Sequence, residues 1–359
     1  MINIGITCQL SRSIWSGSIK QAAINLYECL EHAGTTPIYL SDNSNISDFK
    51  KNHRAFNIKD ILLEDFPRLD ILIMHNFFLN PEETQRIKEK HKNCKIILYH
   101  HDNRIAKDQQ SLLSGKNFIP RSENLDEIWV PEHHSYSIQY LKCYHATDAT
   151  VRSVPFLWSD FYINTAKKSK KIEFDPKKKP RVLVMEPNIN SSKTCLIPLL
   201  ICESFNRTFG KTCESYSIFN TDKIKINRGA KELISKFSSS EQQKIFLNKT
   251  WKSVDAIDKL GQFILTHQSE NELNYLYLEA LSLNLPLIHN SNLIKEYGYF
   301  YNTYDLNKGV NQLYNAILNH SDNLVDYEKE NKDLLYKFNP KNPTNSSFFS
   351  KIVSHLLKK

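Results

Sequence analysis

Glycine is scarce in this sequence, and the patterns that mark dinucleotide-binding and zinc proteins are missing. The chain has 9 glycines among 359 residues, and none of them forms a G-x-G-x-x-G turn. The seven cysteines are scattered and never form C-x-x-C, which argues against zinc and disulfides and for reduced thiols. No apolar run approaches the ~20 residues of a membrane span, and no signal core follows a basic start. We therefore expect a cytoplasmic protein that is not stably inserted in a membrane. Peripheral contact with a membrane surface is compatible with this expectation.

Positive charge exceeds negative charge along the chain. Lys and Arg number 47 against 39 Asp and Glu, which gives a net charge of +8. Much of the excess lies in residues 167–179, where KKSKK and PKKKP occur. Such a run is typical of a solvated linker or loop. Its functional interpretation is attraction to a polyanion, either nucleic acid or an anionic membrane surface.

The alternation of short apolar runs with helix-like segments predicts two α/β halves. Strands of the first half are expected at residues 2–7, 37–40, 69–74, 95–99, 127–130 and 151–156. A strand at 181–185 opens the second half. We expect two doubly wound, Rossmann-like domains, residues 1–160 and 180–325, joined by a basic linker, residues 161–179. C-terminal helices within 326–359 would pack back on the first domain.

Polar clusters follow three consecutive strands of the first half. They are His75-Asn76, His100-His101-Asp102-Asn103 and Pro131-Glu132-His133-His134. Because the carboxyl ends of parallel strands meet at one edge of a sheet, these clusters predict a cleft there. A lone histidine at a strand end is otherwise a hydrogen-bonded loop residue.

The turn before the first predicted helix contains Trp15, Ser16 and Gly17. A glycine between two serines supplies exposed backbone N–H groups that can meet a phosphate or a sugar hydroxyl. The alternative is an ordinary turn between strand and helix, capped by serine.

The stretch 261–291 predicts a βαβ unit with a polar edge. An apolar run at Phe263–Leu265 precedes the polar cluster 267–271, and a helix-like segment then leads to a strand that ends in His289-Asn290-Ser291. In parallel α/β sheets this edge binds ligands. Lys193 lies at the start of a helix in the same half, where a cation is unfavourable unless an anion is bound. The alternative is a lysine on the surface.

This layout resembles the GT-B glycosyltransferases, and the second half resembles the retaining enzymes of the glycogen-synthase kind. Those enzymes carry a Glu, then seven residues, then a second Glu that opens a run of the form LEA-small-x-x-x-P. Residues 278–288, LEALSLNLPLI, fit that run around Glu279. The first Glu is missing, because Asn271 stands eight positions earlier, between Glu270 and Glu272. Which of these three contacts the donor sugar is therefore open.

A second resemblance covers nearly the whole chain. The strings SIWSGSIKQ, EPNINSSKTCLIPLLI, HQSENELNYLYLEALSLNLPLIHNS and GYFYNTYD are similar to an uncharacterised bacterial and phage family with a predicted GT-B fold. In that family a "SIWSNG"-like turn, an "EPNIN-x-x-K" loop and an "HQ-x-x-N-x-LNY" loop recur.

The resemblance implies a nucleotide-diphosphate sugar, above all a UDP-sugar, as co-substrate, with no cofactor and no metal. Glu279 would accept hydrogen bonds from the donor's ribose, and Lys193 would neutralise the leaving diphosphate. The expected donor-binding residues are Gly17, Asn190, Lys193, His267, Glu270, Asn271, Asn274, Glu279 and Asn290. The expected catalytic residues are His100, His101, Asp102 and Lys193. The expected acceptor-binding residues are Trp15, Ser16, Asn76 and His101.

These expectations describe a hexosyl- or pentosyltransferase that retains configuration without a metal ion. An inverting enzyme would instead need a general base near the acceptor hydroxyl, and Asp102 or His101 could serve as that base. The acceptor is either a hydroxymethylated base in phage DNA, which would make double-stranded DNA a partner, or a bacterial envelope glycan. The alternative is a non-catalytic subunit that binds nucleotide sugar or has a regulatory role. The expected location is the cytoplasm of a bacterial cell or of a phage-infected host.

Overall fold

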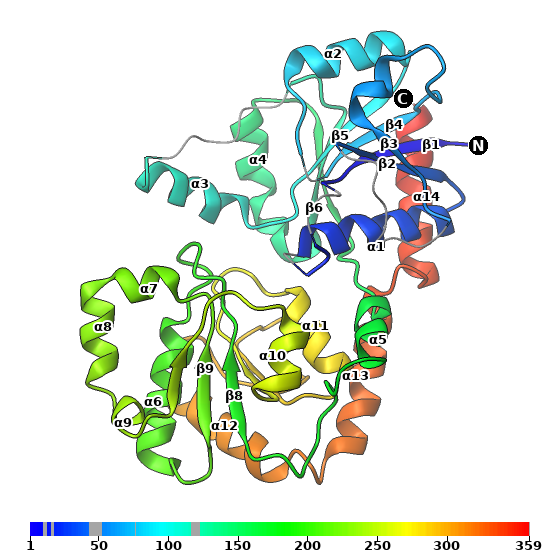
Figure 1. Ribbon diagram of the computed structural model, residues 1–359. Coiled ribbons are helices and arrows are strands. Elements are labelled where there is room, and N and C mark those ends of the chain that lie inside the picture. The colour runs from blue at the N-terminus through cyan, green and yellow to red at the C-terminus, as the bar shows by residue number, and fades with distance from the viewer. Residues whose placement is uncertain (10–12, 16–17, 43–51, 76, 116–122, 359) are drawn as a thin grey trace. The chain divides into compact units, whose positions relative to one another are not determined.

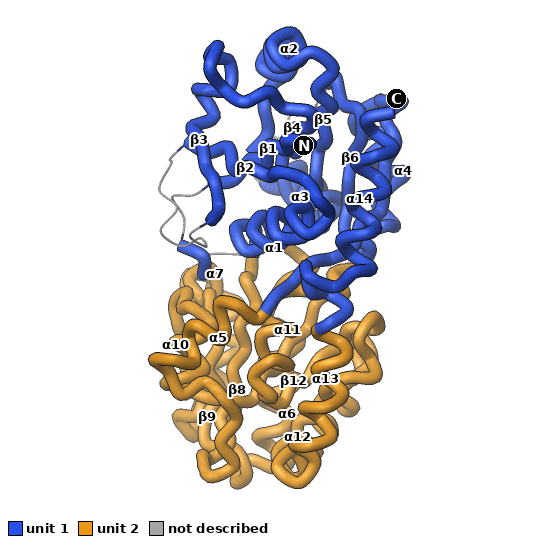
Figure 2. The backbone as a smooth tube through the Cα atoms, turned by 90° about the vertical axis from the view of Figure 1, so that its right-hand side faces the viewer, with its two compact units in different colours: residues 1–159, 336–359 blue, residues 160–335 orange. Residues whose placement is uncertain are grey.

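The structure is a computed structural model that describes residues 1–358 except 10–12, 16–17, 43–51, 76 and 116–122. The chain forms two compact units, residues 1–159 with 336–359, and residues 160–335 (Figure 2). The segment expected as a basic linker belongs to the second unit, where Phe161–Lys167 forms helix α5. The C-terminal stretch is shared, because α13 (Leu324–Phe338) ends in the first unit and α14 (Pro343–Lys358) lies wholly within it.

The first unit is built on a parallel seven-stranded sheet with the order β3-β2-β1-β4-β5-β6-β7 (Figure 1). Its strands are β1 (Asn3–Thr7), β2 (Thr36–Ser41), β3 (Ala55–Asn57), β4 (Ile71–Met74), β5 (Lys95–Tyr99), β6 (Glu127–Pro131) and β7 (Thr150–Val154). Its helices are α1 (Ser18–His32), the 3-10 helix η1 (Ile58–Leu62), α2 (Pro81–Lys90), α3 (Arg104–Leu113), the 3-10 helix η2 (Glu132–Ser137) and α4 (Ile138–His145), together with α14.

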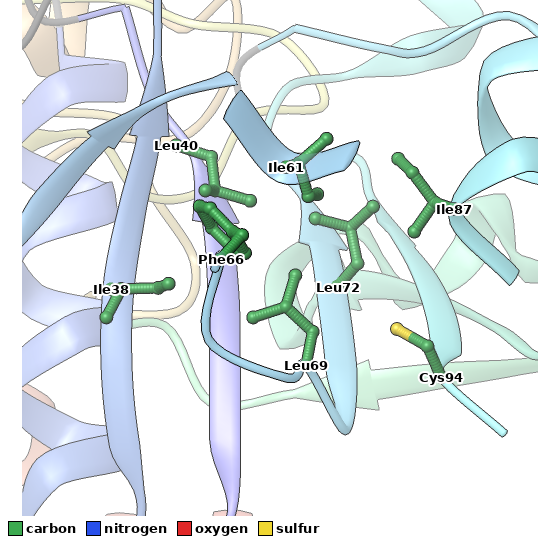
Figure 3. Close-up of a cluster of buried hydrophobic side chains, with 8 residues drawn as sticks. All are labelled: Ile38, Leu40, Ile61, Phe66, Leu69, Leu72, Ile87 and Cys94. Atoms are coloured by element: carbon green, nitrogen blue, oxygen red, sulfur yellow. The ribbon is translucent and has the colours of Figure 1, made fainter. Parts of the chain in front are cut away.

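Helices cover both faces of this sheet, which is why its central strands consist of buried apolar residues. On one face α1 packs beside α14, whose Phe349 ring lies 5.7 Å from the Trp129 ring of β6. On the other face η1 and α2 close a core cluster over β2 and β4 (Figure 3). That cluster consists of Ile38, Leu40, Ile61, Phe66, Leu69, Leu72, Ile87 and Cys94.

The second unit has a parallel six-stranded sheet with the order β10-β9-β8-β11-β12-β13. Its strands are β8 (Arg181–Val184), β9 (Ser215–Ile218), β10 (Ile245–Leu247), β11 (Phe263–Leu265), β12 (Leu287–His289) and β13 (Tyr299–Phe300). Its helices, besides α5 and α13, are α6 (Leu196–Phe209), α7 (Asp222–Ile226), α8 (Arg228–Ser235), α9 (Ser238–Glu241), α10 (Ser253–Lys259), α11 (Tyr275–Ser282) and α12 (Leu306–Asn319). Gly309 lets α12 approach α6, since a Cβ there would lie 2.6 Å from Cδ1 of Ile201.

Both sheets have the order that creates a topological switch point, at β1/β4 in the first unit and at β8/β11 in the second. Ligands bind at the carboxyl ends of the strands at such a point. The predicted pair of doubly wound α/β domains is confirmed. Among the described residues, no helix is long and apolar enough to cross a bilayer.

Candidate functional site

A buried carboxylate holds the carboxyl edge of the second sheet together. Glu186 follows β8, and its Oε1 accepts hydrogen bonds from the Thr266 hydroxyl and from the backbone N–H of His267, at 3.1 Å in the second case. Its Oε2 accepts a hydrogen bond of 2.9 Å from Nε2 of Gln268. Because these partners directly follow β11, Glu186 joins the two strand ends that flank the switch point.

Burial raises the pKa of Glu186 to about 7, against the opposing effect of its hydrogen bonds and of the Lys193 cation. Desolvation disfavours the charged form of a carboxyl group, and hydrogen bonds to that form compensate only in part. Glu186 therefore changes its protonation near neutral pH at the edge where a ligand would bind.

His267 presents a buried hydrogen-bond acceptor at the same edge. Its Nδ1 lies 3.1 Å from the Tyr301 hydroxyl, which donates its own proton to the carbonyl oxygen of Thr266 at 2.8 Å. The hydroxyl oxygen can then only accept from Nδ1–H, so Nε2 carries the lone pair. Nε2 has no hydrogen-bond partner within the described residues, and burial lowers the pKa of His267 to about 4. A sugar hydroxyl is a donor that would satisfy this nitrogen.

The loop after β11 is fixed by side-chain amides. Asn290 accepts a hydrogen bond from the backbone N–H of Gln268 and donates to its carbonyl oxygen, both at 2.9 Å. Asn271 donates to Oε1 of Gln268 and to the carbonyl oxygen of Leu273. Asn274 caps α11 by accepting a hydrogen bond of 3.0 Å from the N–H of Tyr277. These three predicted donor-binding side chains therefore shape the loop.

Glu270, Asn271 and Glu272, the three residues at the position of the missing glutamate, differ in their surroundings. Asn271 is buried within the loop, and the Glu272 carboxylate accepts hydrogen bonds from the N–H groups of Asn292 and Leu293 at 2.6 and 3.3 Å. Glu270 is exposed and has a positive φ of 51°, a conformation that costs energy for a residue with a side chain. The Glu272 carboxylate therefore caps the loop after β12, while Glu270 lies on the exposed side of the loop after β11.

Glu279 lies on α11 and is 4% exposed. It accepts a hydrogen bond of 2.8 Å from the hydroxyl of Ser253, the first residue of α10. Trp251, two residues earlier, is 38% exposed and its ring lies 6.1 Å from that of Phe219. Sequence reasoning missed Ser253, although the helical pattern before Phe263 could have placed it at this sheet edge.

Lys193 lies in the loop between β8 and α6, close enough to Glu186 to lower the pKa of that carboxyl group. The backbone N–H of Lys193 donates to the carbonyl oxygen of Asn190 at 3.2 Å, which closes a turn. The side-chain oxygen of Asn190 is buried, with no hydrogen-bond partner in the part of the chain that the structure describes. Ser269 N–H donates to the carbonyl oxygen of Ser192, so this turn adjoins the loop after β11.

In the first unit, the predicted histidine clusters meet because β4, β5 and β6 are neighbours. The His101 ring lies 5.2 Å from the rings of both His75 and Tyr99. Both ring nitrogens of His75 are buried without a hydrogen-bond partner among the described residues. Burial, and secondarily His101, lowers the pKa of His75 well below its usual value. His75 is therefore neutral at pH 7.

The other predicted catalytic residues of this unit have protein partners. Nε2 of His100 lies 3.2 Å from Nε2 of His145, and burial lowers the pKa of His100 to about 3. Asp102 forms a half-exposed salt bridge of 3.1 Å with Lys107. His101 is half-buried beside the rings of His75 and Tyr99.

Three predicted residues, Ser16, Gly17 and Asn76, lie outside the described residues. Trp15 is half-buried, and its backbone N–H donates to the Ser13 hydroxyl at 3.3 Å. Within the described ranges, no group of three or more His, Cys, Asp or Glu side chains is placed to hold a metal ion.

Known structures share this architecture at low sequence identity. An alpha-glucosyltransferase solved with UDP-glucose and DNA containing an abasic site is 13% identical, with a TM-score of 0.60 over 100% of this chain and 99% of that one. A glycosyltransferase from Rickettsia africae is 13% identical, with a TM-score of 0.61 over 100% and 99%. A trehalose-6-phosphate synthase is 11% identical, with a TM-score of 0.59 over 98% and 99%. Identity this low supports the fold alone.

No curated protein sequence matches the chain. The family model described as "Protein of unknown function (DUF2827)" matches residues 2–353. The chain therefore belongs to the DUF2827 family, and its two doubly wound units have the GT-B fold.

Proposed function

We propose that the protein is a glycosyltransferase that takes its sugar from a nucleotide-diphosphate sugar bound at the carboxyl edge of the second unit. One observation carries the proposal. A lysine turn before α6 and an unpartnered acceptor nitrogen after β11 lie at this edge, and a buried carboxylate lies in α11, hydrogen-bonded to the first residue of α10. These are the chemical groups that a ribose, a diphosphate and a sugar hydroxyl require.

In this proposal each group binds one part of the donor. Glu279, held by Ser253, accepts hydrogen bonds from the ribose hydroxyls. His267 accepts a hydrogen bond from a sugar hydroxyl at Nε2, and Glu270 approaches the sugar from the exposed side of the same loop. UDP and UDP-glucose occupy alpha-glucosyltransferases of the same fold, which supports a UDP-sugar as the donor.

In this proposal, Lys193 neutralises the negative charge that develops on the departing diphosphate. A preorganised cation at that position stabilises the transition state, typically by a factor of about 100–1000. The reaction would then proceed without a metal ion and with retention, and the leaving phosphate would take the proton of the acceptor hydroxyl. His101 of the first unit is the proposed contact for the acceptor.

Two measurements, one with UDP and one with UDP-glucose, test the donor site. Calorimetry gives the affinity for UDP, and release of UDP from the donor gives turnover. Glu279→Ala should weaken UDP binding about 10- to 100-fold, as expected for loss of charge-assisted hydrogen bonds. Lys193→Ala should lower turnover by about 100-fold or more. The controls are Glu330→Ala and Lys329→Ala, exposed positions on α13. Wild-type behaviour of both site variants would refute the site.

The acceptor is tested separately with hydroxymethylated duplex DNA and with envelope glycolipid. The net charge of +8 and the DNA-bound neighbours support the first, and transfer to it should decline steeply with salt. Tight UDP binding without turnover on either acceptor would instead indicate a non-catalytic nucleotide-sugar-binding protein.

A further inference from the structure

An apolar pocket opens between α6, α7 and α8 of the second unit, with a volume of about 280 Å³. Its apolar lining includes Leu199, Ile224 and Ile234. Two aliphatic side chains of its wall are exposed: Leu196 is 49% and Leu233 is 41% exposed. Ile189 and Ile226, each adjacent in sequence to a residue of the wall, are 55% and 82% exposed. Burial of these four side chains against an apolar phase would release a substantial free energy.

Basic residues accompany these aliphatic side chains. Residues 222–236 contain five cations against two carboxylates. Lys236 forms a salt bridge of 2.9 Å with Glu232. The other charged residues of this stretch are one carboxylate, Asp222, and four cations: Lys223, Lys225, Arg228 and Lys231. In the strongest basic run of the sequence, residues 167–179, three of the seven lysines form salt bridges: Lys167, Lys170 and Lys179 with Glu173, Asp255 and Glu214.

We propose that these four aliphatic side chains and four cations, here called the α6–α8 patch, dock the protein on a bilayer that contains anionic phospholipid. Aliphatic side chains would enter the interface while the cations meet the lipid phosphates. The composition fits a membrane better than a protein partner, because protein interfaces favour aromatic residues and are depleted of lysine. It also differs from nucleic-acid surfaces, in which polar and aromatic side chains, rather than exposed aliphatic ones, accompany the Lys and Arg that meet phosphates. The proposal concerns where the protein binds and does not depend on the donor chemistry.

Vesicle sedimentation with the full chain tests the patch. The probes are vesicles of phosphatidylcholine alone and of phosphatidylcholine with phosphatidylglycerol, at low and physiological salt. The protein should bind the anionic vesicles and lose affinity as salt rises. The double variant Lys223→Gln with Arg228→Gln should bind roughly thirty-fold more weakly, because each cation near an anionic surface contributes about 1 kcal/mol. The double variant Ile226→Glu with Leu233→Glu should lose binding to the same vesicles.

The matched controls lie on α13 of the same unit. Val325 is 80% exposed, close to the 82% of Ile226, so Val325→Glu places one carboxylate on a comparably exposed aliphatic position, and Lys329→Gln removes one exposed cation. Both should bind vesicles as the wild type does. Equal binding to neutral vesicles, unchanged binding by the patch variants, or equal losses in the controls would overturn the proposal. Duplex DNA binding that the Lys223/Arg228 variant loses, without vesicle binding, would overturn it in favour of a nucleic-acid surface. UDP release measured on each variant keeps this test separate from the donor site.

Discussion

The hydroxyl of Tyr301 stands between Nδ1 of His267, at 3.1 Å, and the carbonyl oxygen of Thr266, at 2.8 Å. It joins the end of β13 to the end of β11 and sets the tautomer of the histidine. One hydroxyl proton thereby decides whether the buried Nε2 of His267 is a hydrogen-bond acceptor or a donor.

Removing this acceptor should separate recognition of the sugar from recognition of the nucleotide. His267→Phe should weaken UDP-glucose binding by about tenfold, in line with one lost hydrogen bond of about 1.4 kcal/mol, and leave UDP binding unchanged. Tyr301→Phe should have a smaller effect of the same kind, because the tautomer is no longer held. Calorimetry with both ligands measures the ratio. Tyr299→Phe is the control, since its hydroxyl bonds instead to Nδ1 of His320 at 3.0 Å. Equal losses for UDP and UDP-glucose would count against the assignment.

Glu186 should give the protein a specific dependence of stability on pH. Its pKa is raised from an ordinary 4.5 to about 7, so between these values the folded chain keeps a proton that the unfolded chain releases. This carboxyl group therefore lowers the free energy of unfolding as pH rises from 4.5 to 7, by about 3 kcal/mol in all. Glu186→Gln abolishes that dependence.

Buried histidines act in the opposite direction over an overlapping range. Burial lowers the pKa of His100 to about 3 and those of His267 and His289 to about 4, from an ordinary 6.5. Their stabilising contribution is complete above pH 6.5 and is lost as the pH falls towards these values. Urea unfolding at pH 5 and pH 7 should therefore show a steeper gain of stability with pH in Glu186→Gln than in the wild type. Parallel profiles would show that Glu186 does not titrate in this range.

Periodicity was enough to predict the elements that form the site. The apolar run Phe263–Leu265, the polar loop after it and the helix that carries Glu279 occupy β11, its loop and α11. Likewise, the histidines after β4 and β5 come together because neighbouring parallel strands end at the same edge. Predictions of this kind succeed since a strand or helix is determined by residues close in sequence.

The contacts that assemble the site could not be predicted in the same way. Glu186 meets Thr266 across 80 positions of sequence, and Ser253 meets Glu279 across 26. No period connects such residues, and a polar side chain at a strand end has many possible partners. Asn290 illustrates the result, because a side chain predicted to bind the donor is held by the backbone of Gln268.

A buried ion pair supports the histidine edge of the first unit. Arg104 and Asp108 are 1% and 3% exposed, their atoms Nε and Oδ2 lie 2.6 Å apart, and the Tyr140 hydroxyl donates to the same carboxylate at 2.7 Å. Arg104→Ala should lower the free energy of unfolding by about 3–5 kcal/mol, because it leaves a buried carboxylate without its cation. The double variant Arg104→Met with Asp108→Leu should recover most of that loss. Urea unfolding measures both, and equal instability of the single and double variants would contradict this explanation.

The hydrogen bond of 2.8 Å from Ser253 to Glu279 leads to a last prediction, about how the carboxylate is oriented. If Glu279 binds the ribose, Ser253 acts on the ligand only through that carboxylate, so the two substitutions cannot have independent effects. Ser253→Ala should weaken UDP binding about 3- to 10-fold in the wild type, the value of one hydrogen bond of about 1 kcal/mol. In the Glu279→Ala background the same change should have no further effect. Ser253→Thr keeps the hydroxyl and should restore binding. A Ser253→Ala loss of equal size in both backgrounds would mean that Ser253 contacts the nucleotide itself, and the orienting role would then be wrong.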